Sequence, residues 1–235
     1  MVQELMPHQF LLNWLYGTLS GGLVADLLCS RRAFSRLATR WSHSRGSRRR
    51  IAPFVRTFDV SMDEYESDTY QSFNDFFIRR LRSGARSFCR TPERLPAWAE
   101  GACLAWERVL GTETFPVKGE HLTAAALMGS PEKAAPFEGG PLLLIRLRPQ
   151  DYHRFHFADE GEVVDHYHVP GRLHSVNLLS LRRRSDVLAS NERQVTIQQT
   201  RHFGRLAYVE VGAMLVGRIV QQATTQAVRG QEKGY

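Results

Sequence analysis

Cysteine is scarce in this sequence, and its few cysteines do not form pairs. Among 235 residues there are three, Cys29, Cys89 and Cys103, and no C-x-x-C spacing occurs. An odd, scattered set does not build a disulfide framework. We therefore expect the chain to work in a reducing compartment, where disulfides are rare.

Long uninterrupted apolar runs are also missing. The stretch over residues 9–25 contains no charged side chain, but Asn13, Gly17 and Gly21 interrupt it. A membrane-spanning helix needs about 20 apolar residues. A signal peptide needs basic residues ahead of its apolar core, and this chain has Glu4 there. The sequence therefore predicts neither a spanning helix nor a secretion signal.

Two common catalytic signatures are absent as well. The sequence has no Gly-rich phosphate loop of either common type and no G-x-S-x-G turn. Neither a phosphate-binding loop nor the nucleophile elbow of the usual serine hydrolases is therefore supported.

Acidic residues are fewer than basic ones. The chain has 31 Lys and Arg against 24 Asp and Glu, a formal charge of +7 and a pI of about 9.7. This balance indicates an anionic partner and leaves nucleic acid, lipid headgroups and acidic ligands open. An apolar content of 43% is enough for a folded core and is not typical of a disordered chain.

Four arginines fall in a predicted amphipathic helix over residues 31–41. The apolar face would carry Phe34, Leu37, Ala38 and Trp41, and the opposite face Arg32, Arg36 and Arg40. Such a helix suits an anionic membrane surface, and it is equally typical of a helix packed on a protein core. Trp14 and Tyr16 in the preceding segment favour membrane contact, because such rings prefer the bilayer interface. Nucleic acid is not favoured, since no stacking module of basic and aromatic residues follows.

The chain divides into a helical region, residues 1–65, and a second domain, residues 66–235. Residues 66–92 are predicted to form a helix capped by Ser72 or Asn74. The apolar stripe of this helix would be Phe73, Phe76, Phe77 and Leu81. Further on, short apolar runs separated by turns have the spacing of strands: PLLLIRL, GEVVDHYHV, QVTIQQT and LAYVEVGAMLVGRIV. The predicted fold class is α+β, a β-rich domain preceded by N-terminal amphipathic helices.

Two histidines, His153 and His156, follow the run PLLLIRL and come just after Asp151. Metal binding, acid–base catalysis and a purely structural role are all compatible with this group. A zinc site is not favoured, because the other histidines do not stand at a recognised ligand spacing. The residues by themselves leave catalysis and a structural role open.

Six segments, in this order, resemble the phosphatidylserine decarboxylase family. They are SFNDFFIRRL at 72–81, LRPQDYHRFHF at 147–157, PGRLHSVN at 170–177, NERQV at 191–195, VEVGAMLVGRIV at 209–220 and RGQEKGY at 229–235. The resemblance covers about residues 60–235. The basic N-terminal region is also similar in kind to the membrane-associating helices of this family.

The resemblance implies a pyruvoyl-dependent carboxy-lyase that forms phosphatidylethanolamine and CO2. Such enzymes are made as proenzymes that cut themselves at a Gly-Ser bond, and the serine becomes the pyruvoyl group of a small α chain. The pyruvoyl carbonyl forms a Schiff base with the substrate amine and acts as an electron sink. A proton must then return to the substrate, which suits a histidine with a pKa near neutral.

The resemblance also implies roles for individual residues. His156 matches the histidine of an Asp-His-Ser self-cleavage triad, and His153 matches the histidine of substrate positioning and decarboxylation. Asp151 and Arg154 are expected to brace the turn that carries them. The residues expected to bind substrate are Ser175 and Asn177, which match a pocket-lining S-V-N segment, and Tyr152.

This sequence departs from the family pattern in three places. Glu100 stands where the family has the triad aspartate, and its extra methylene shifts the carboxylate, which matters for a triad. Arg218 replaces a small hydroxyl residue, and an arginine buried there would need a partner. No Gly-Ser-Thr segment follows Tyr235, so the pyruvoyl serine is not present in this chain.

We expect a β chain whose small α chain is a separate partner. The alternatives are a truncated gene product, an inactive paralogue that binds a membrane or a partner, and a family decarboxylase of a soluble amino acid. The predicted partners are an anionic membrane surface, phosphatidylserine and the α chain. A homo-oligomer is compatible with the sequence, and neither nucleic acid nor a metal is expected. The predicted location is the cytoplasmic side of a bacterial cell membrane, as a peripheral protein.

Overall fold

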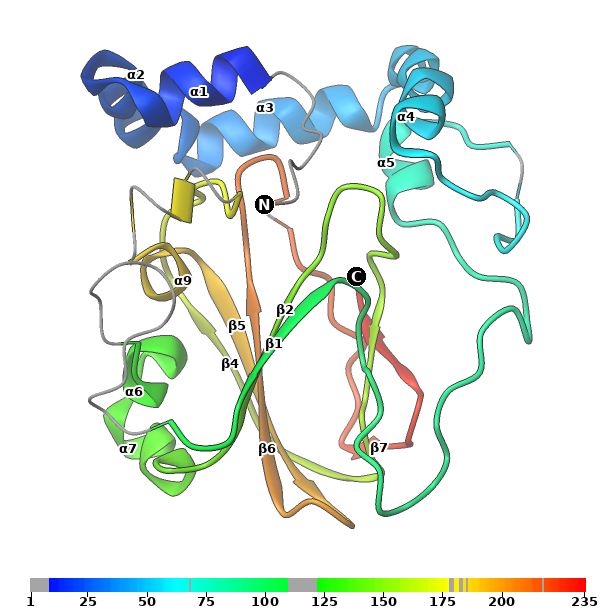
Figure 1. Ribbon diagram of the computed structural model, residues 1–235, viewed down its shortest axis with the longest axis vertical. Coiled ribbons are helices and arrows are strands. Elements are labelled where there is room, and N and C mark those ends of the chain that lie inside the picture. Colours follow the sequence, from blue (N-terminus) through cyan, green and yellow to red (C-terminus); the bar gives the residue numbers. More distant parts are fainter. Residues whose placement is uncertain are drawn as a thin grey trace.

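The computed structural model describes residues 9–67, 69–109, 122–177, 180–181, 184, 186–216 and 218–235. Within them, N-terminal helices are followed by small antiparallel sheets and a few short helices (Figure 1). The α+β fold with N-terminal helices is thereby confirmed.

Helices form the N-terminal region and lie across one end of the sheets (Figure 1). They are α1 (Gln9–Gly17), α2 (Leu19–Val24), the π-helix η1 (Ala25–Cys29), α3 (Arg32–Ser42), the 3-10 helix η2 (Arg45–Arg50) and α4 (Ile51–Phe58). Thr18 begins α2 because its side chain accepts a hydrogen bond from the Gly21 amide at 3.0 Å. Gly21 also lets α2 approach α1, since a Cβ there would lie 1.9 Å from the Trp14 carbonyl oxygen. No helix in the described residues is long and apolar enough to cross a bilayer.

The helix predicted over residues 31–41 is confirmed as α3. Its apolar side does not pack on the core, because Phe34, Leu37 and Trp41 are exposed. The small Ser35 is the residue that this helix buries. The protein therefore leaves the apolar side of an amphipathic helix uncovered.

The strands of the second region pair in antiparallel fashion. They are β1 (Ala102–Trp106), β2 (Leu142–Arg146), β3 (Phe155–His156), β4 (Gly161–Val169), β5 (Arg193–Thr200), β6 (Arg205–Val211), β7 (Gln226–Ala227) and β8 (Glu232–Gly234). One sheet has the order β6-β5-β4-β7, while β1 pairs with β2 and β3 pairs with β8. The four apolar runs predicted as strands overlap β2, β4, β5 and β6, which confirms these strands, but the last run leaves the strand after Val211. Every second residue of β4 is exposed, as expected for a half-buried strand.

Short helices flank the strands. They are α5 (Phe73–Phe77), α6 (Ala124–Met128), α7 (Pro131–Ala134), the 3-10 helix η3 (Ala135–Phe137) and α9 (Val187–Ser190). Ser72, one of the two caps predicted, begins α5 and accepts a hydrogen bond from the Asp75 amide at 3.1 Å. Buried Met128 of α6 packs in one cluster with Val195 and Ile197 of β5. α6, α7 and η3 thus pack against β5 of the sheet.

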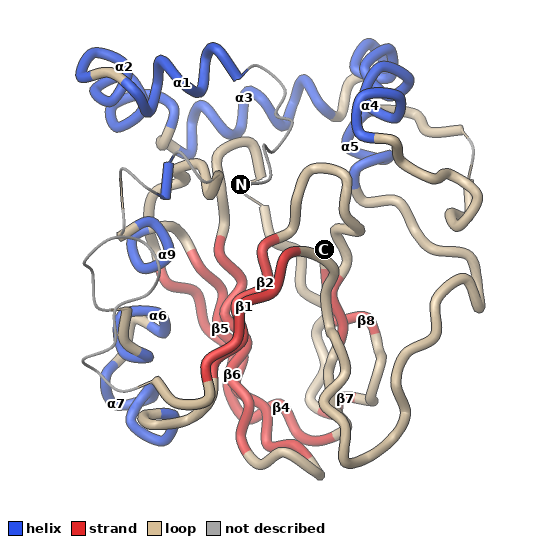
Figure 2. Tube along the Cα trace, in the orientation of Figure 1, coloured by secondary structure: helices blue, strands red, loops and turns tan. Residues whose placement is uncertain are grey.

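The long helix predicted over residues 66–92 is wrong, because among the residues of this range that the structure describes only the five of α5 are helical. Backbone groups that would continue the helix bond to an earlier segment instead. The Glu66 amide donates to the Arg80 carbonyl at 2.9 Å, and the Arg82 amide donates to the Glu64 carbonyl at 2.8 Å. These long-range bonds end the helical pattern, and the chain continues to β1 mainly as loop (Figure 2).

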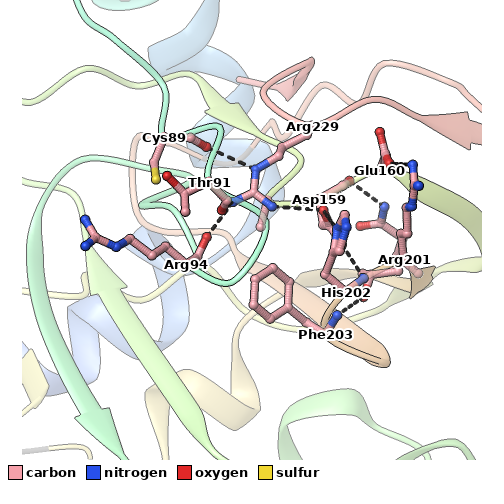
Figure 3. A network of polar contacts seen from close by, with 12 residues as sticks. Cys89, Thr91, Arg94, Asp159, Glu160, Arg201, His202, Phe203 and Arg229 are labelled. Carbon is pink, nitrogen blue, oxygen red and sulfur yellow. Dashed lines mark hydrogen bonds and ion pairs between the residues drawn. The ribbon is translucent and has the colours of Figure 1, made fainter.

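A fully buried carboxylate, Asp159, joins three segments of the second region (Figure 3). It accepts hydrogen bonds from the His202 amide at 2.8 Å and from His202 Nδ1 at 3.0 Å, and it pairs with Arg229 at 3.0 Å. Arg229 also donates to the carbonyl oxygens of Cys89 and Thr91, at 3.0 and 2.7 Å. Burial alone would raise the pKa of Asp159, but the His202 and Arg229 contacts lower this pKa overall. Asp159 is therefore held as a charged, fully partnered anchor.

Candidate active site

The two histidines predicted to be catalytic lie between β2 and β4, His153 on the loop before β3 and His156 at the end of β3. Asp151 fixes the start of this loop, since it accepts from the Arg148 amide at 2.7 Å and pairs with the Arg148 guanidinium at 2.8 Å. The buried Arg79 donates to the carbonyl oxygens of Gln150 and Asp151, at 2.6 and 3.3 Å. The predicted bracing role of Asp151 is confirmed by these contacts.

Arg154 is the second brace, again as predicted. Its Nε donates to the Ile78 carbonyl at 2.9 Å, and its Nη1 donates to Glu232 Oε1 at 2.7 Å. The guanidinium also lies over the ring of Tyr235, 4.7 Å from its centroid. Arg154 thus ties the histidine loop both to the end of α5 and to the segment RGQEKGY at 229–235.

His153 is held in the neutral form. Its ring stacks on Phe77 of α5 with 3.9 Å between centroids, and its Nε2 lies 3.1 Å from the Arg148 carbonyl oxygen. Because a carbonyl oxygen only accepts hydrogen bonds, Nε2 carries the hydrogen and Nδ1 keeps the free lone pair. Burial lowers the pKa of His153 to about 4, although the Arg148 carbonyl acts in the opposite direction. The near-neutral pKa expected from the sequence is therefore not found here.

His156 ends β3 and stands opposite Glu232 of β8 in the strand register. Its amide donates to the Trp98 carbonyl at 2.8 Å, and its ring stacks on Tyr152 with 6.2 Å between centroids. Burial lowers the pKa of His156, and the negative charge of Glu232 opposes this effect. Both histidines are therefore favoured in the neutral form, which is the form that can accept a proton.

Glu100 lies beside the histidine loop, on the chain just before β1. Its Oε2 accepts a hydrogen bond from the Tyr152 amide at 3.2 Å, and its other oxygen pairs with the Arg86 guanidinium. Among the described residues no hydrogen bond joins Glu100 to His156. The carboxylate instead holds the backbone of Tyr152, whose ring stacks on His156.

Ser175 and Asn177 lie on a different loop, next to the N-terminal helices. The Ser175 amide donates to Tyr16 Oη at 3.0 Å, and Asn177 Oδ1 accepts from the Ser180 amide at 2.7 Å. Asn177 Nδ2 is buried without a hydrogen-bond partner in the described part of the chain, so it can still donate to a ligand. Within the same part, hydrogen bonds and ring contacts do not join this loop to His153 or His156.

Two other features of the sequence have plain outcomes. Arg218 is exposed, so it does not need the partner that a buried arginine would need. In the ranges that the structure describes, no three His, Cys, Asp or Glu side chains gather closely enough to hold a metal ion.

Three supports of the site were missed from the sequence. Phe77, expected only in a core stripe, stacks on His153. Arg79 holds the loop backbone, and Glu232 pairs with Arg154 opposite His156. All three belong to segments that carry the family resemblance, and that was the signal available to find them.

The low pKa of His153 predicts acid sensitivity of the fold. The unfolded chain takes up this proton near pH 6.5 and the folded chain only near pH 4, so the free energy of unfolding falls as pH drops through this window. The expected loss is up to roughly 3 kcal/mol. Denaturant unfolding at about pH 7 and about pH 4.5 measures it. The His153→Gln variant should lose less stability on acidification than the wild type, and equal losses would contradict the prediction.

Comparison with known proteins bears directly on this site. The family model for phosphatidylserine decarboxylase matches residues 73–235, a range that contains both histidines and the Ser175 loop. The phosphatidylserine decarboxylase proenzyme of Clostridium kluyveri is 36% identical over 229 residues, covering 95% of this chain and 77% of the relative. Proenzyme 2 of Clostridium acetobutylicum is 33% identical over 224 residues, covering 95% of this chain and 76% of the relative.

A relative from another bacterium gives the same result. The proenzyme of Chlamydia trachomatis is 33% identical over 237 residues, covering 99% of this chain and 79% of the relative. Family model and relatives agree on the family, and the match to this relative also includes the N-terminal helices, which the family model does not reach. The chain therefore belongs to the phosphatidylserine decarboxylase family, whose members are pyruvoyl-dependent carboxy-lyases made as proenzymes.

Proposed function

We propose that this chain decarboxylates phosphatidylserine to phosphatidylethanolamine and CO2, with His153 and His156 at the reacting site. The observation that carries the proposal is the pairing of β3 with β8. In the family, the segment similar to RGQEKGY leads to the serine that becomes the pyruvoyl group. Here this segment lies in register against His156, beside the loop that holds His153.

The residues of this chain suit the pyruvoyl cofactor of the family. When bound, that group supplies a carbonyl that takes up the substrate amine and draws electrons from the bond to the leaving carboxylate. Asn177 offers a buried amide donor that has no partner in the described residues, and it would hold an oxygen of the substrate or of the cofactor. Ser175 and Tyr152 are the other residues that we assign to substrate binding.

His153 would return a proton to the carbon that has lost its carboxylate. Its pKa of about 4 keeps it neutral in the free protein near pH 7. The phosphate and carboxylate charges of the substrate favour the charged imidazole, so binding would load Nδ1 with a proton. The bond from Nε2 to the Arg148 carbonyl holds the ring in place meanwhile, and a buried imidazolium gives up its proton readily.

His156 would act as the base of self-cleavage. The neutral form that burial favours is the form that takes a proton from a serine hydroxyl. Glu100 would orient His156 indirectly. Its carboxylate holds the backbone amide of Tyr152, and the ring of Tyr152 stacks on the ring of His156. This differs from a direct bond between carboxylate and imidazole.

We also propose that the N-terminal helices bind an anionic bilayer. Large exposed apolar side chains are concentrated there: Phe10, Leu11, Trp14, Leu19, Leu23, Leu27, Leu28, Phe34, Leu37 and Trp41. The hairpin at residues 213–216, which follows β6, adds the exposed side chains of Leu215 and Val216. Arg218, close to them in the sequence, is also exposed. So much uncovered apolar surface marks an interaction site. The arginines of α3 and a substrate that is an anionic lipid argue for a bilayer as the occupant.

Replacing Leu37 by glutamate is expected to weaken vesicle binding about tenfold or more. Leu37 is 67% exposed on α3, and the variant loses apolar burial in the bilayer and adds a repelled charge. Co-sedimentation with phosphatidylserine vesicles measures the change. Leu104→Glu is the matched control, because Leu104 is also exposed but lies on β1. Equal binding of the two variants would argue against the helical face.

We further propose a peripheral protein on the cytoplasmic side of a bacterial cell membrane, and the exposed apolar side chains of the N-terminal helices support the membrane contact. We divide the chain near residue 65, into a membrane-associating region and a catalytic domain. The proenzyme names of the relatives support a small α chain as partner. The uncovered apolar helices favour a lipid substrate over a soluble amino acid.

Incubating the purified enzyme with vesicles of carboxyl-labelled phosphatidylserine tests the proposed reaction. We expect labelled CO2 and an equal amount of phosphatidylethanolamine, with a small pyruvoyl-bearing chain visible by intact mass. Release of CO2 from free serine alone would favour a soluble amino acid as substrate. No CO2 from either compound would favour a protein that only binds membranes.

A further inference from the structure

The loop that carries Ser175, at residues 173–175, lies between the N-terminal helices and the β-rich domain. Three successive amides of this loop bond alternately to the two sides. The bonds run from Leu173 N to the Ser30 carbonyl at 3.0 Å, from His174 N to Asn191 Oδ1 at 2.9 Å, and from Ser175 N to Tyr16 Oη at 3.0 Å. The helices therefore supply part of the hydrogen bonding that shapes this loop.

Other contacts strengthen the same junction. Asp26, in the π-helix η1, pairs with Arg184 and lies 3.8 Å from His174 Nε2. Short π-helical segments are rare and are frequently found at functional sites. Met214, on the hairpin after β6, packs against the cluster that contains Tyr16. The Met214 amide also donates to the His174 carbonyl at 3.3 Å, so helix, hairpin and loop form one connected unit.

The helix α1 carries both side chains that are exposed and side chains that pack inside the protein. Phe10, Leu11 and Trp14 are exposed, whereas Leu15 and Tyr16 are buried. Burial raises the pKa of Tyr16, so its hydroxyl keeps its proton, and its oxygen accepts a hydrogen bond from the Ser175 amide at 3.0 Å. A change in the position or mobility of α1 at a bilayer would therefore act directly on the bond that holds Ser175.

We propose that Tyr16 is a positioning residue that couples bilayer contact of α1 to the conformation of the loop from Ser175 to Asn177. Docking of the exposed apolar side chains would restrict α1 and favour the bonded form of the loop. The substrate-binding groups would then be ordered when the protein is on the membrane that contains its substrate. This inference rests on the proposed membrane contact and on the proposed substrate role of Ser175.

Hydrogen exchange of residues 172–177 tests the coupling in the full chain. The probe is vesicles of phosphatidylcholine with about 30% phosphatidylserine, and their binding is measured in parallel by sedimentation. Tyr16→Phe keeps the ring and removes only the hydroxyl. Tyr167→Phe is the matched control, because it removes a tyrosine hydroxyl whose bond, to the Met128 carbonyl at 3.0 Å, lies outside this junction.

The expected result has three parts. Vesicles slow exchange in the wild type and in Tyr167→Phe, whereas the Ser175 amide of Tyr16→Phe exchanges about fivefold to tenfold faster and is not slowed by vesicles. All three proteins sediment equally with vesicles. Equal slowing in Tyr16→Phe, or binding of the wild type without any slowing, would overturn the coupling and leave membrane contact standing. Failure of the wild type to sediment would overturn the membrane contact itself, and the coupling with it.

Discussion

Replacing His153 by alanine is expected to lower kcat/KM for phosphatidylserine about a hundredfold to ten-thousandfold, the range typical of a lost general acid or base. The alanine variant removes the nitrogen that would carry the proton while the backbone brace at Asp151 stays in place. Release of CO2 from vesicles, measured with the pyruvoyl-bearing enzyme, gives the loss directly. Intact mass of the small chain shows in the same sample that maturation has occurred.

A second histidine variant serves as the control for this result. His166 lies on β4, where its Nδ1 contacts Thr196 Oγ1 at 3.0 Å, away from the histidine loop. His166→Ala should keep kcat/KM within about twofold of the wild type, as is usual for changes outside the reacting groups. A loss of less than tenfold in a matured, folded His153→Ala enzyme would remove this residue from the chemistry. An unmatured His153→Ala chain would instead place the residue in self-cleavage.

Local patterns were sufficient to predict much of the fold. The apolar runs from PLLLIRL onward predicted β2, β4, β5 and β6, because period and turn residues are carried by neighbouring positions. The amphipathic pattern over residues 31–41 likewise predicted α3. These patterns do not show what packs against each face of a helix or strand. The apolar side of α3, which a core-packed helix would bury, is exposed in this protein.

Long-range contacts account for what the sequence did not show. The helix predicted over residues 66–92 stops at Phe77 because later backbone groups bond to Glu64 and Glu66, which no local pattern encodes. The low pKa of His153 arises from burial against Phe77, a residue 76 positions earlier in the chain. Glu100 was expected to orient His156, yet its hydrogen bond goes to the amide of Tyr152. Charge and residue type were readable from the sequence, whereas the partner was not.

Replacing Asp159 by alanine is expected to lower the free energy of unfolding by about 3–5 kcal/mol. The carboxylate is fully buried, and its removal leaves the Arg229 guanidinium and the His202 ring and amide without their shared acceptor. Arg229 would then hold the chain at Cys89 and Thr91 by carbonyl contacts alone. Denaturant unfolding of both proteins near pH 7 measures the difference.

The neighbouring acid provides the control for that measurement. Glu160 is one residue further on and pairs with Arg201 at 2.5 Å, but the Arg201 side chain is 70% exposed. Solvent-exposed pairs contribute about 0–1 kcal/mol, so Glu160→Ala should stay within that range. A loss below about 1 kcal/mol in Asp159→Ala would mean that Arg229 and His202 find water or other acceptors once the carboxylate is gone. A large loss confined to Asp159→Ala would instead support a joining role of this one buried charge. Asp159 would then hold together the 89–94 loop, the turn at His202 and the RGQEKGY segment. Because that segment contains β8, the same charge would help to keep β8 paired with β3, which carries His156.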